Sequence, residues 1–355
     1  MKNVFFSYFL FPLTLVSLAS CSSCSSSSDE EHDGPKPSVS RCIVAGYSNA
    51  GRISSASPAD YPYLKYPTRV YCFGISPDAQ GVWYVNPERE RQQNTVRAAM
   101  TSSQEAFLVV GGGATAGNMY RMGTDPAKRA AFARAVVEYA HARGFDGIDV
   151  GTGNGLDPAM GWSSEPFLHV PEDDMVDLLQ QIRARMAELP VGTKVRQLTA
   201  ALSSSTRGQS MGGRIAGYVD HINVMIYDTY GTEEEGYPHA PMRVLKESLA
   251  GYAAAGVPNS KIIVGVPFYG GDKSVSPVIT QPYNTLCAMA GGAITASSNS
   301  YGGYAFNGVD LMKEKTQYVL DNGYAGLTIW ELSQDVAYDS PLSLLRAIKS
   351  VADAK

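Results

Sequence analysis

The sequence predicts an α/β fold, a single (β/α)8 TIM barrel over residues 41–355, and two observations carry that prediction. Eight short apolar segments rich in β-branched residues recur along this part of the chain, and helical stretches separate most of them. The apolar residues of these segments are continuous, which is typical of parallel strands buried on both faces. This repeating pattern suits a closed barrel. A doubly wound open sheet is the alternative, because alternating strands and helices do not separate the two folds.

Eight segments are predicted to form the barrel strands, and each is followed by a loop. They cover residues 42–47, 68–74, 106–112, 145–150, 197–202, 221–228, 261–268 and 324–330. The connection between the last two strands, residues 269–323, is expected to hold one helix. That expectation leaves little room for an inserted second domain.

Helices are predicted from apolar residues that recur at helical spacing and from residues that favour helix ends. The clearest stretches are 125–144, 171–189, 308–323 and 340–353. Pro126 lies near the start of the first, and Gly144 can stop it. The second has acids in its first turn and Arg183 and Arg185 near its end, which suits the helix dipole.

The first 40 residues are predicted to lie outside the fold. Residues 1–20 hold one lysine and a short apolar run, as in a secretory signal peptide. The ending LASC resembles a bacterial lipobox, which implies lipid attachment to Cys21; an ordinary signal peptide with a chance cysteine is the alternative. Residues 21–40 are serine-rich and acidic, and they are predicted to form a flexible tether. The acidic run 29–31 after the serines resembles a lipoprotein surface-export signal, so the expected location is the surface of a bacterial outer membrane.

The composition argues against several classes of function. A formal net charge of −5 makes the chain a poor candidate for nucleic-acid binding. The five histidines are scattered without the spacing of metal ligands, so neither a metal nor a cofactor is expected. No apolar stretch beyond the signal approaches the length of a transmembrane helix. Contact with a membrane is therefore expected through the lipid anchor only.

The residues that carry the chemistry of a TIM barrel lie where its strands end. Five of the predicted strand ends read, in chain order, VVGGGATAG, DGIDVGTG, MIYDTYG, GVPFYG and GLTIWELSQD. These ends, in this order, resemble those of glycoside hydrolase family 18, the family of chitinases and endo-β-N-acetylglucosaminidases. The resemblance covers about residues 42–350 and implies the barrel fold and a site for glycans that contain N-acetylglucosamine.

The fourth strand departs from the family's motif, D-x-x-D-x-D-x-E. Asp146 and Asp149 match the first two acids, but Gly151 and Gly153 stand where the third aspartate and the glutamate belong. The resemblance implies that the glutamate is the general acid and that the adjacent aspartate orients the sugar's acetamido group, whose oxygen attacks the anomeric carbon. Glycine supplies neither group, so the family's mechanism is expected to be crippled here.

Other parts of the family's site are kept. Tyr227 and Asp228 match the motif M-x-Y-D, in which the tyrosine helps to hold the N-acetyl group and the aspartate helps to bind sugar. Trp330 matches the tryptophan that forms the floor under the sugar, and an aromatic face suits the apolar face of a pyranose. The third strand departs slightly, because Val109 or Val110 stands in place of the family's serine.

These residues also have purely structural interpretations. Asp146 is expected to satisfy buried backbone donors, and Asp149 could do the same. Tyr227 and Trp330 could fill the barrel, although strand ends face the site in this fold.

The leading hypothesis is a lipid-anchored, lectin-like protein that binds a chitin-like glycan or an N-glycan, with neighbouring glycan-uptake proteins as possible partners. The alternative is an active glycoside hydrolase with a relocated acid, drawn from Asp157, Glu165, Asp228 or the loop 233–235. A third class is a protein-binding decoy on the same barrel, which would need an exposed apolar patch.

Overall fold

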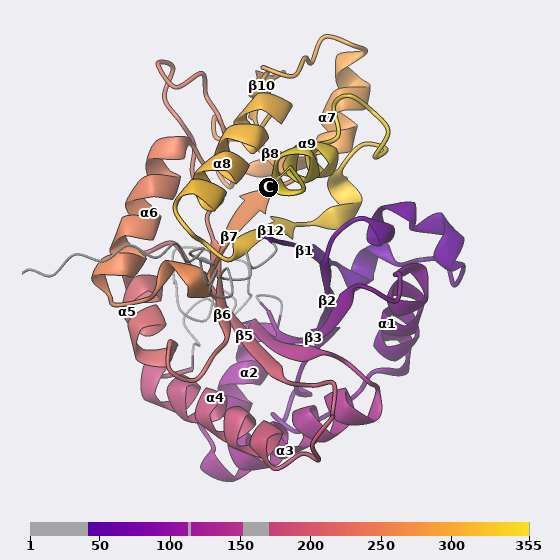
Figure 1. The fold of residues 1–355 in the computed structure, drawn as a ribbon, viewed down its shortest axis with the longest axis vertical. Helices are drawn as coiled ribbons and strands as arrows, with labels where there is room; N and C mark the ends of the chain where they lie inside the picture. The colour runs from indigo at the N-terminus through magenta and orange to yellow at the C-terminus, as the bar shows by residue number, and fades with distance from the viewer. Residues whose placement is uncertain (1–41, 113–114, 152–169, 355) are drawn as a thin grey trace, which may run out of the picture. The chain divides into compact units, whose positions relative to one another are not determined.

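A computed structural model of the chain describes residues 42–112, 115–151 and 170–354. Eight parallel strands close into a barrel (Figure 1). They are β1 (Ile43–Ser48), β2 (Arg69–Ile75), β3 (Glu105–Gly111), β4 (Gly147–Gly151), β5 (Gln197–Ser203), β6 (His221–Met225), β7 (Ile262–Pro267) and β12 (Gly326–Trp330). Their order around the barrel is β1-β12-β7-β6-β5-β4-β3-β2. Because β1 pairs with both β2 and β12, the sheet has no edge here and the open-sheet alternative is excluded.

Each barrel strand overlaps one predicted segment, so the (β/α)8 prediction is confirmed. The largest difference is at β6, which ends at Met225 instead of at residue 228. Tyr227 and Asp228 therefore lie in the loop that follows the strand.

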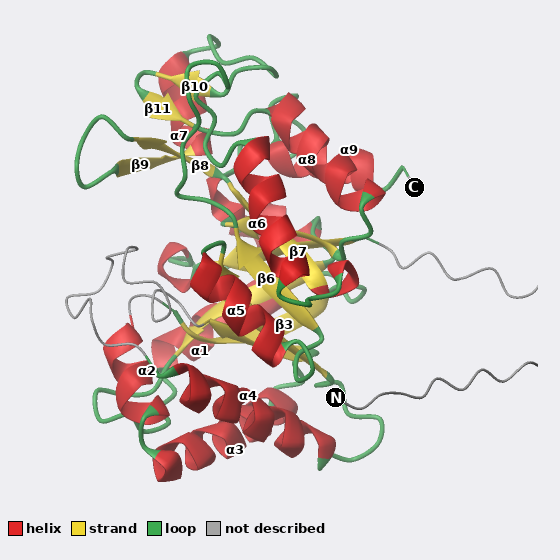
Figure 2. Cartoon of the chain, turned by 90° about the vertical axis from the view of Figure 1, so that its left-hand side faces the viewer, coloured by secondary structure: helices red, strands yellow, loops and turns green. Residues whose placement is uncertain are grey.

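The helices, apart from α7, cover the outside of the barrel (Figures 1 and 2). They are α1 (Pro87–Ala99), α2 (Ala116–Gly123), α3 (Pro126–Ala142), α4 (Glu172–Ala187), α5 (Thr206–Ile215), α6 (Met242–Ala254), α7 (Tyr283–Ala290), α8 (Val309–Asp321) and α9 (Leu344–Ala352). Short 3-10 helices span Ala50–Arg52, Pro58–Asp60, Pro62–Lys65, Asn259–Lys261 and Leu332–Gln334. Asp125 caps α3 by accepting hydrogen bonds from two backbone amides, and Pro126 occupies its first turn. Within the described ranges, no helix is both long enough and apolar enough to span a membrane.

The connection from β7 to β12 differs from the expected single helix. It holds α7, α8 and a four-stranded antiparallel sheet made of β8 (Tyr269–Asp272), β9 (Ile279–Pro282), β10 (Ser300–Tyr301) and β11 (Tyr304–Ala305). Figure 2 shows this small sheet and α7 beyond one end of the barrel strands. The expectation was wrong because these strands are very short and rich in glycine and polar residues, so they lack the apolar run that marked the barrel strands.

The interior of the barrel holds a cluster that is separate from the layer between strands and helices. Its buried members are Ala45, Tyr47, Tyr71, Phe107 and Val109. Arg69, at the start of β2, is 1% exposed and lies 4.2 Å above the Phe107 ring. It donates hydrogen bonds of 2.7 Å to Glu105 and to Gln197, so its charge is paired where the strands begin.

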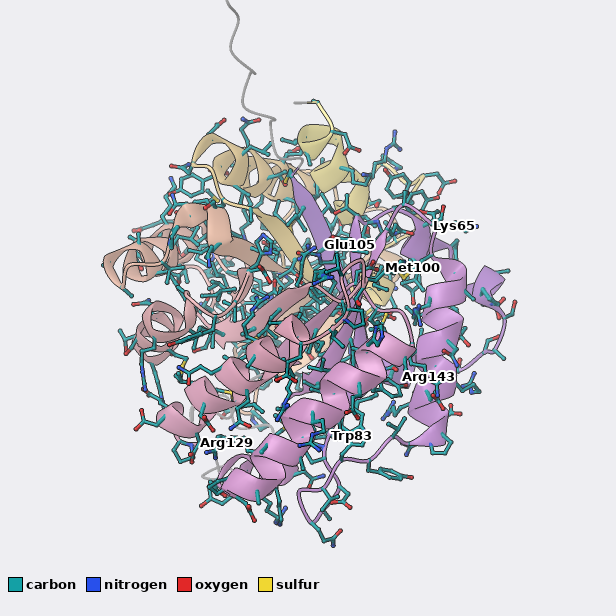
Figure 3. All side chains as sticks on the ribbon, turned by 60° about the horizontal axis from the view of Figure 1, so that its bottom comes forward. Lys65, Trp83, Met100, Glu105, Arg129 and Arg143 are labelled. Carbon is teal, nitrogen blue, oxygen red and sulfur yellow. The ribbon has the colours of Figure 1, made fainter. Side chains whose placement is uncertain are left out.

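The outer helices are joined by ion pairs at both ends of α3, where Arg129 and Arg143 are labelled in Figure 3. Arg129 is 3.0 Å from Asp174 and 2.5 Å from Asp177, both on α4. Arg143 pairs with Glu90 of α1. These contacts fix the helices around the half of the barrel that carries β3 and β4.

Candidate functional site at the C-terminal end of the barrel

Asp149 lies in the middle of β4 and is fully buried inside the barrel. The Tyr47 hydroxyl donates to its Oδ2 over 2.9 Å, while Thr199 and Asn223 donate to its Oδ1 over 2.5 and 3.0 Å. Because all three partners can donate, the network suits an ionised carboxylate. Burial nevertheless raises the pKa of Asp149 from 3.8 to about 6, against the opposite effect of these hydrogen bonds.

Asp146 has the structural role that the sequence suggested. It precedes β4, and its Oδ2 accepts a hydrogen bond of 2.9 Å from the backbone amide of Ala106. Lys194 lies 3.5 Å from its other oxygen. Asp146 thus stands at the start of the strand, away from the end where the site is expected.

Gly151 is the last residue of β4, and backbone atoms of β3 surround the place of its missing side chain. Its carbonyl accepts a hydrogen bond of 3.1 Å from the amide of Gly112. A Cβ on Gly151 would lie 3.3 Å from both the Gly112 nitrogen and the Val110 oxygen. On the facing strand, Gly111 has φ 86°, and a Cβ there would lie 2.5 Å from the Gly151 oxygen. The ends of β3 and β4 therefore approach each other closely because both carry glycine. Gly153 lies outside the described residues.

Trp330 ends β12 and is half-buried. Its ring centroid lies 5.5 Å from that of Tyr47 and 5.7 Å from that of Phe73, within the range of favourable aromatic pairs. Tyr47 in turn stacks on Tyr71 at 4.7 Å. Part of the Trp330 side chain fills the end of the barrel, and part stays exposed, as a platform for a sugar requires.

Tyr227 and Asp228 follow β6 and lie beside Tyr269 of β8. The Tyr227 ring is 6.3 Å from that of Tyr269, and the Tyr269 hydroxyl donates to Asp228 Oδ1 over 2.5 Å. Burial, and then the charges of Asp228 and Asp149, raise the pKa of Tyr227 well above its usual value. Burial also raises the pKa of Asp228, whose side chain is 26% exposed. Tyr227 therefore lies close enough to both carboxyl groups for their charges to raise its pKa.

The structure thus places Tyr227, Asp228 and Trp330 at one end of the barrel, while Asp149 is buried inside the barrel and bonded to Tyr47. It adds Tyr47 and Tyr269, which the sequence analysis did not single out. Tyr47 ends the predicted strand 42–47, and Tyr269 lies in the strand end GVPFYG, so the same positional rule predicts both. Tyr227 is 8% exposed, and no hydrogen bond joins its hydroxyl to another of the described residues.

The loop 233–235, one suggested source of a relocated acid, lies within the described residues. Glu235 accepts a hydrogen bond of 2.9 Å from the amide of Thr232 and lies 3.1 Å from Arg243. Glu233 and Glu234 are exposed. The loop therefore uses Glu235 to hold its own conformation.

Two other suggested acids, Asp157 and Glu165, lie outside the described residues, so the structure does not test them. Glu331 follows Trp330 but is 1% exposed, and its Oε1 accepts a hydrogen bond of 2.6 Å from Ser333. In the part of the chain that the structure describes, no three or more His, Cys, Asp or Glu side chains gather as metal ligands would.

The closed barrel, with aromatic and carboxyl groups where its strands end, defines a protein of the TIM-barrel class. The chain belongs to the glycosyl hydrolases family 18, whose family model matches residues 44–335. Endochitinase 1 of Metarhizium robertsii is 25% identical over an alignment of 280 residues that covers 66% of this chain and 62% of that protein. The chain thus spans less than two thirds of that relative's length.

Solved structures share the fold. The GH18 chitinase ChiB from the chitin utilization locus of Flavobacterium johnsoniae has a TM-score of 0.67 and 22% identity, with 89% of this chain and 96% of that chain covered. The chitinase-like agglutinin from Robinia pseudoacacia has a TM-score of 0.69 and 22% identity, with 87% of this chain and 99% of that chain covered. At this level of identity the likeness establishes the fold.

Proposed function

We propose that this chain binds glycans containing N-acetylglucosamine, either chitin-like or from an N-glycan, and hydrolyses them poorly or not at all. The observation that carries the proposal is the packing of Gly151 against the end of β3. At this position the family motif has an aspartate, and two residues later its general acid. General-acid catalysis is worth roughly 10²–10⁴ in rate. Glycine stands at the end of β4 and at the facing end of β3, so no side chain supplies a carboxylate at residue 151.

Several features support retained binding. Trp330 keeps an exposed part beside Tyr47 and Phe73, and the Tyr227 hydroxyl has no partner among the described residues. Asp228 is held by Tyr269 with part of its carboxyl group exposed. An aromatic surface with a few fixed polar groups is the usual composition of a site for small ligands.

The test of binding is a glycan array with the purified chain, followed by calorimetric titration with the best ligand. Tyr227→Phe removes only the hydroxyl and should weaken binding by about 2- to 10-fold, the worth of one hydrogen bond. Tyr324→Phe is the matched control, because Tyr324 stacks on Tyr318 of α8 on the outside of the barrel. If no array glycan binds, or if both variants bind like the wild type, the proposal loses its support.

A weakly active hydrolase is the second candidate, and one observation favours it. Asp228 is a partly exposed carboxyl group beside Tyr269, and burial raises its pKa against the opposite effect of the Tyr269 hydrogen bond, the direction that favours a proton donor. In that case Asp228→Asn would abolish turnover while leaving the thermal unfolding temperature nearly unchanged. Turnover that survives this variant would exclude Asp228 as the acid.

We also propose that the chain is a surface lipoprotein tethered through Cys21, where it would capture glycan for neighbouring uptake proteins. The lipobox-like LASC and the serine-rich, acidic residues 21–40 support this proposal. Metabolic labelling with a fatty acid should mark the wild type and not Cys21→Ala. Protease accessibility of intact cells would then distinguish the outer surface from the periplasmic side.

A further inference from the structure

Asp228 has an unusual backbone conformation. Its φ is 61°, in the left-handed region that non-glycine residues rarely adopt. Tyr237 and Ala240, each with φ 50°, share this feature and lie in the segment that packs against Asp228. Such conformations persist only where neighbouring groups hold them, and they gather at functional sites.

His239 is the group that holds Asp228. The Asp228 backbone amide donates to His239 Nε2 over 2.6 Å, and His239 Nδ1 lies 3.1 Å from the Tyr269 carbonyl oxygen. A backbone amide only donates, so Nε2 must be the unprotonated nitrogen and Nδ1 must carry the proton. Burial lowers the pKa of His239 to about 3, so the ring is neutral, and its 3.8 Å approach to the Asp228 carboxyl group is not an ion pair.

The ring of His239 is itself fixed on all sides. It is fully buried, with Tyr230 stacked on it at 4.9 Å and the edge of Tyr269 at 4.8 Å. Tyr269 thus contacts both members of the pair, through its hydroxyl to Asp228 and through its carbonyl to His239.

The backbone around His239 is anchored to α8. Lys315 of α8 is fully buried and donates to the Ala240 carbonyl over 2.6 Å and to Asn307 Oδ1 over 2.5 Å. The Asn307 side chain donates in turn to the His239 carbonyl oxygen. These hydrogen bonds therefore connect α8 to the backbone of His239 and Ala240, and His239 connects that segment to Asp228 in the loop after β6.

We propose that His239 is a positioning residue, whose neutral imidazole holds Asp228 in the left-handed conformation that presents its carboxyl group to a bound sugar. This role rests on the proposed glycan-binding function for its purpose, and on the contacts above for its geometry. His239 touches no ligand itself and acts through Asp228.

The geometry is tested without any glycan. In the wild-type protein, the nitrogen NMR signals of His239 should show an unprotonated Nε2 and a protonated Nδ1 from pH 5 to pH 8. The Asp228 amide should exchange slowly with deuterium in the wild type and in His239→Gln, because glutamine offers both an acceptor and a donor. It should exchange quickly in His239→Leu, which offers neither. The opposite tautomer, or a doubly protonated ring, would overturn the proposal, and so would an Asp228 amide that is equally protected in His239→Leu.

The consequence for binding is tested by titration with N,N′,N″-triacetylchitotriose. His239→Leu should bind about tenfold more weakly or worse, and His239→Gln should restore affinity to within about threefold of the wild type. A folded His239→Leu protein that binds like the wild type would contradict the proposal. If His239→Leu does not fold, the wild-type tautomer and the exchange in His239→Gln still decide the matter. If the wild type does not bind this sugar, the proposed function is wrong for chitin-like ligands. The exchange experiment still tests whether His239 holds the Asp228 amide.

Discussion

Gly112 donates a backbone hydrogen bond to the carbonyl oxygen of Gly151 across 3.1 Å, and this contact joins the ends of β3 and β4. It lies where the family's motif calls for an aspartate. The missing carboxylate is therefore accompanied by a close approach of the two strands, which a side chain at Gly151 would disturb. The following predictions depend on this relationship and on the residues that surround it.

Gly151→Ala should lower the free energy of unfolding by about 1–3 kcal/mol, because its Cβ would lie 3.3 Å from the Gly112 nitrogen and the Val110 oxygen and would push these backbone atoms away. Gly217→Ala is the matched control, since a Cβ at Gly217 meets nothing within 4 Å, and it should change stability by less than about 0.5 kcal/mol. Denaturant titration measures both. Equal stability of the two variants would show that the strand ends are not closed against each other.

Restoring the two motif acids with Gly151→Asp and Gly153→Glu should return little hydrolysis. A side chain at residue 151 begins with a Cβ only 3.3 Å from the Gly112 nitrogen and the Val110 oxygen, and a small displacement of a catalytic group is enough to lose most of its effect. Product formation from a chitooligosaccharide is the measurement, together with the unfolding temperature. A stable double variant that gains about 10²-fold or more in rate would show that loss of the acids alone silenced the site.

Trp330→Ala should abolish detectable glycan binding, because it removes the aromatic face that remains exposed at the end of β12. Some loss of stability is expected as well, since Trp330 also packs on Tyr47 and Phe73. Trp83→Ala is the control: Trp83 packs on Phe132 of α3, outside the barrel, so its loss should lower stability and leave affinity unchanged. Folded Trp330→Ala protein that still binds would mean that Trp330 only fills the barrel.

The buried carboxyl of Asp149 should make stability depend on pH. Its pKa is about 6 in the folded protein against 3.8 ordinarily, so the folded state holds the proton more tightly. Asp149 therefore contributes most to the free energy of unfolding below about pH 4, and this contribution is lost as the pH rises to about 6. The difference is on the order of 3 kcal/mol. Asp149→Asn should lack this slope between pH 4 and pH 6. Asp335, whose pKa is also raised to about 6 by burial, contributes equally to both proteins and cancels in the comparison. Parallel pH profiles of the two proteins would contradict the prediction.

The barrel could be predicted because each strand carries a continuous apolar run that is buried on both faces. The inserted sheet of β8 to β11 could not, because strands such as Tyr269–Asp272 contain no such run and are held by their neighbours. At the site, Trp330 and Tyr227 could be predicted because they lie at strand ends that resemble the motifs of family 18. The role of His239 could not be found, since its contact with Asp228 joins two loops and depends on backbone conformation. The contact between Gly112 and Gly151 could not be predicted either, because a sequence motif does not give the distance between two strands.

The most direct test of binding without efficient hydrolysis is one experiment on the purified chain. Chitohexaose is incubated at a concentration that saturates binding in calorimetry, and products are followed by mass spectrometry, with Asp228→Asn protein prepared in parallel. We predict saturable binding by the wild type and no products above those of the protein-free control. Products that increase in proportion to wild-type protein, and that are absent with Asp228→Asn, would contradict the account and identify a working hydrolase.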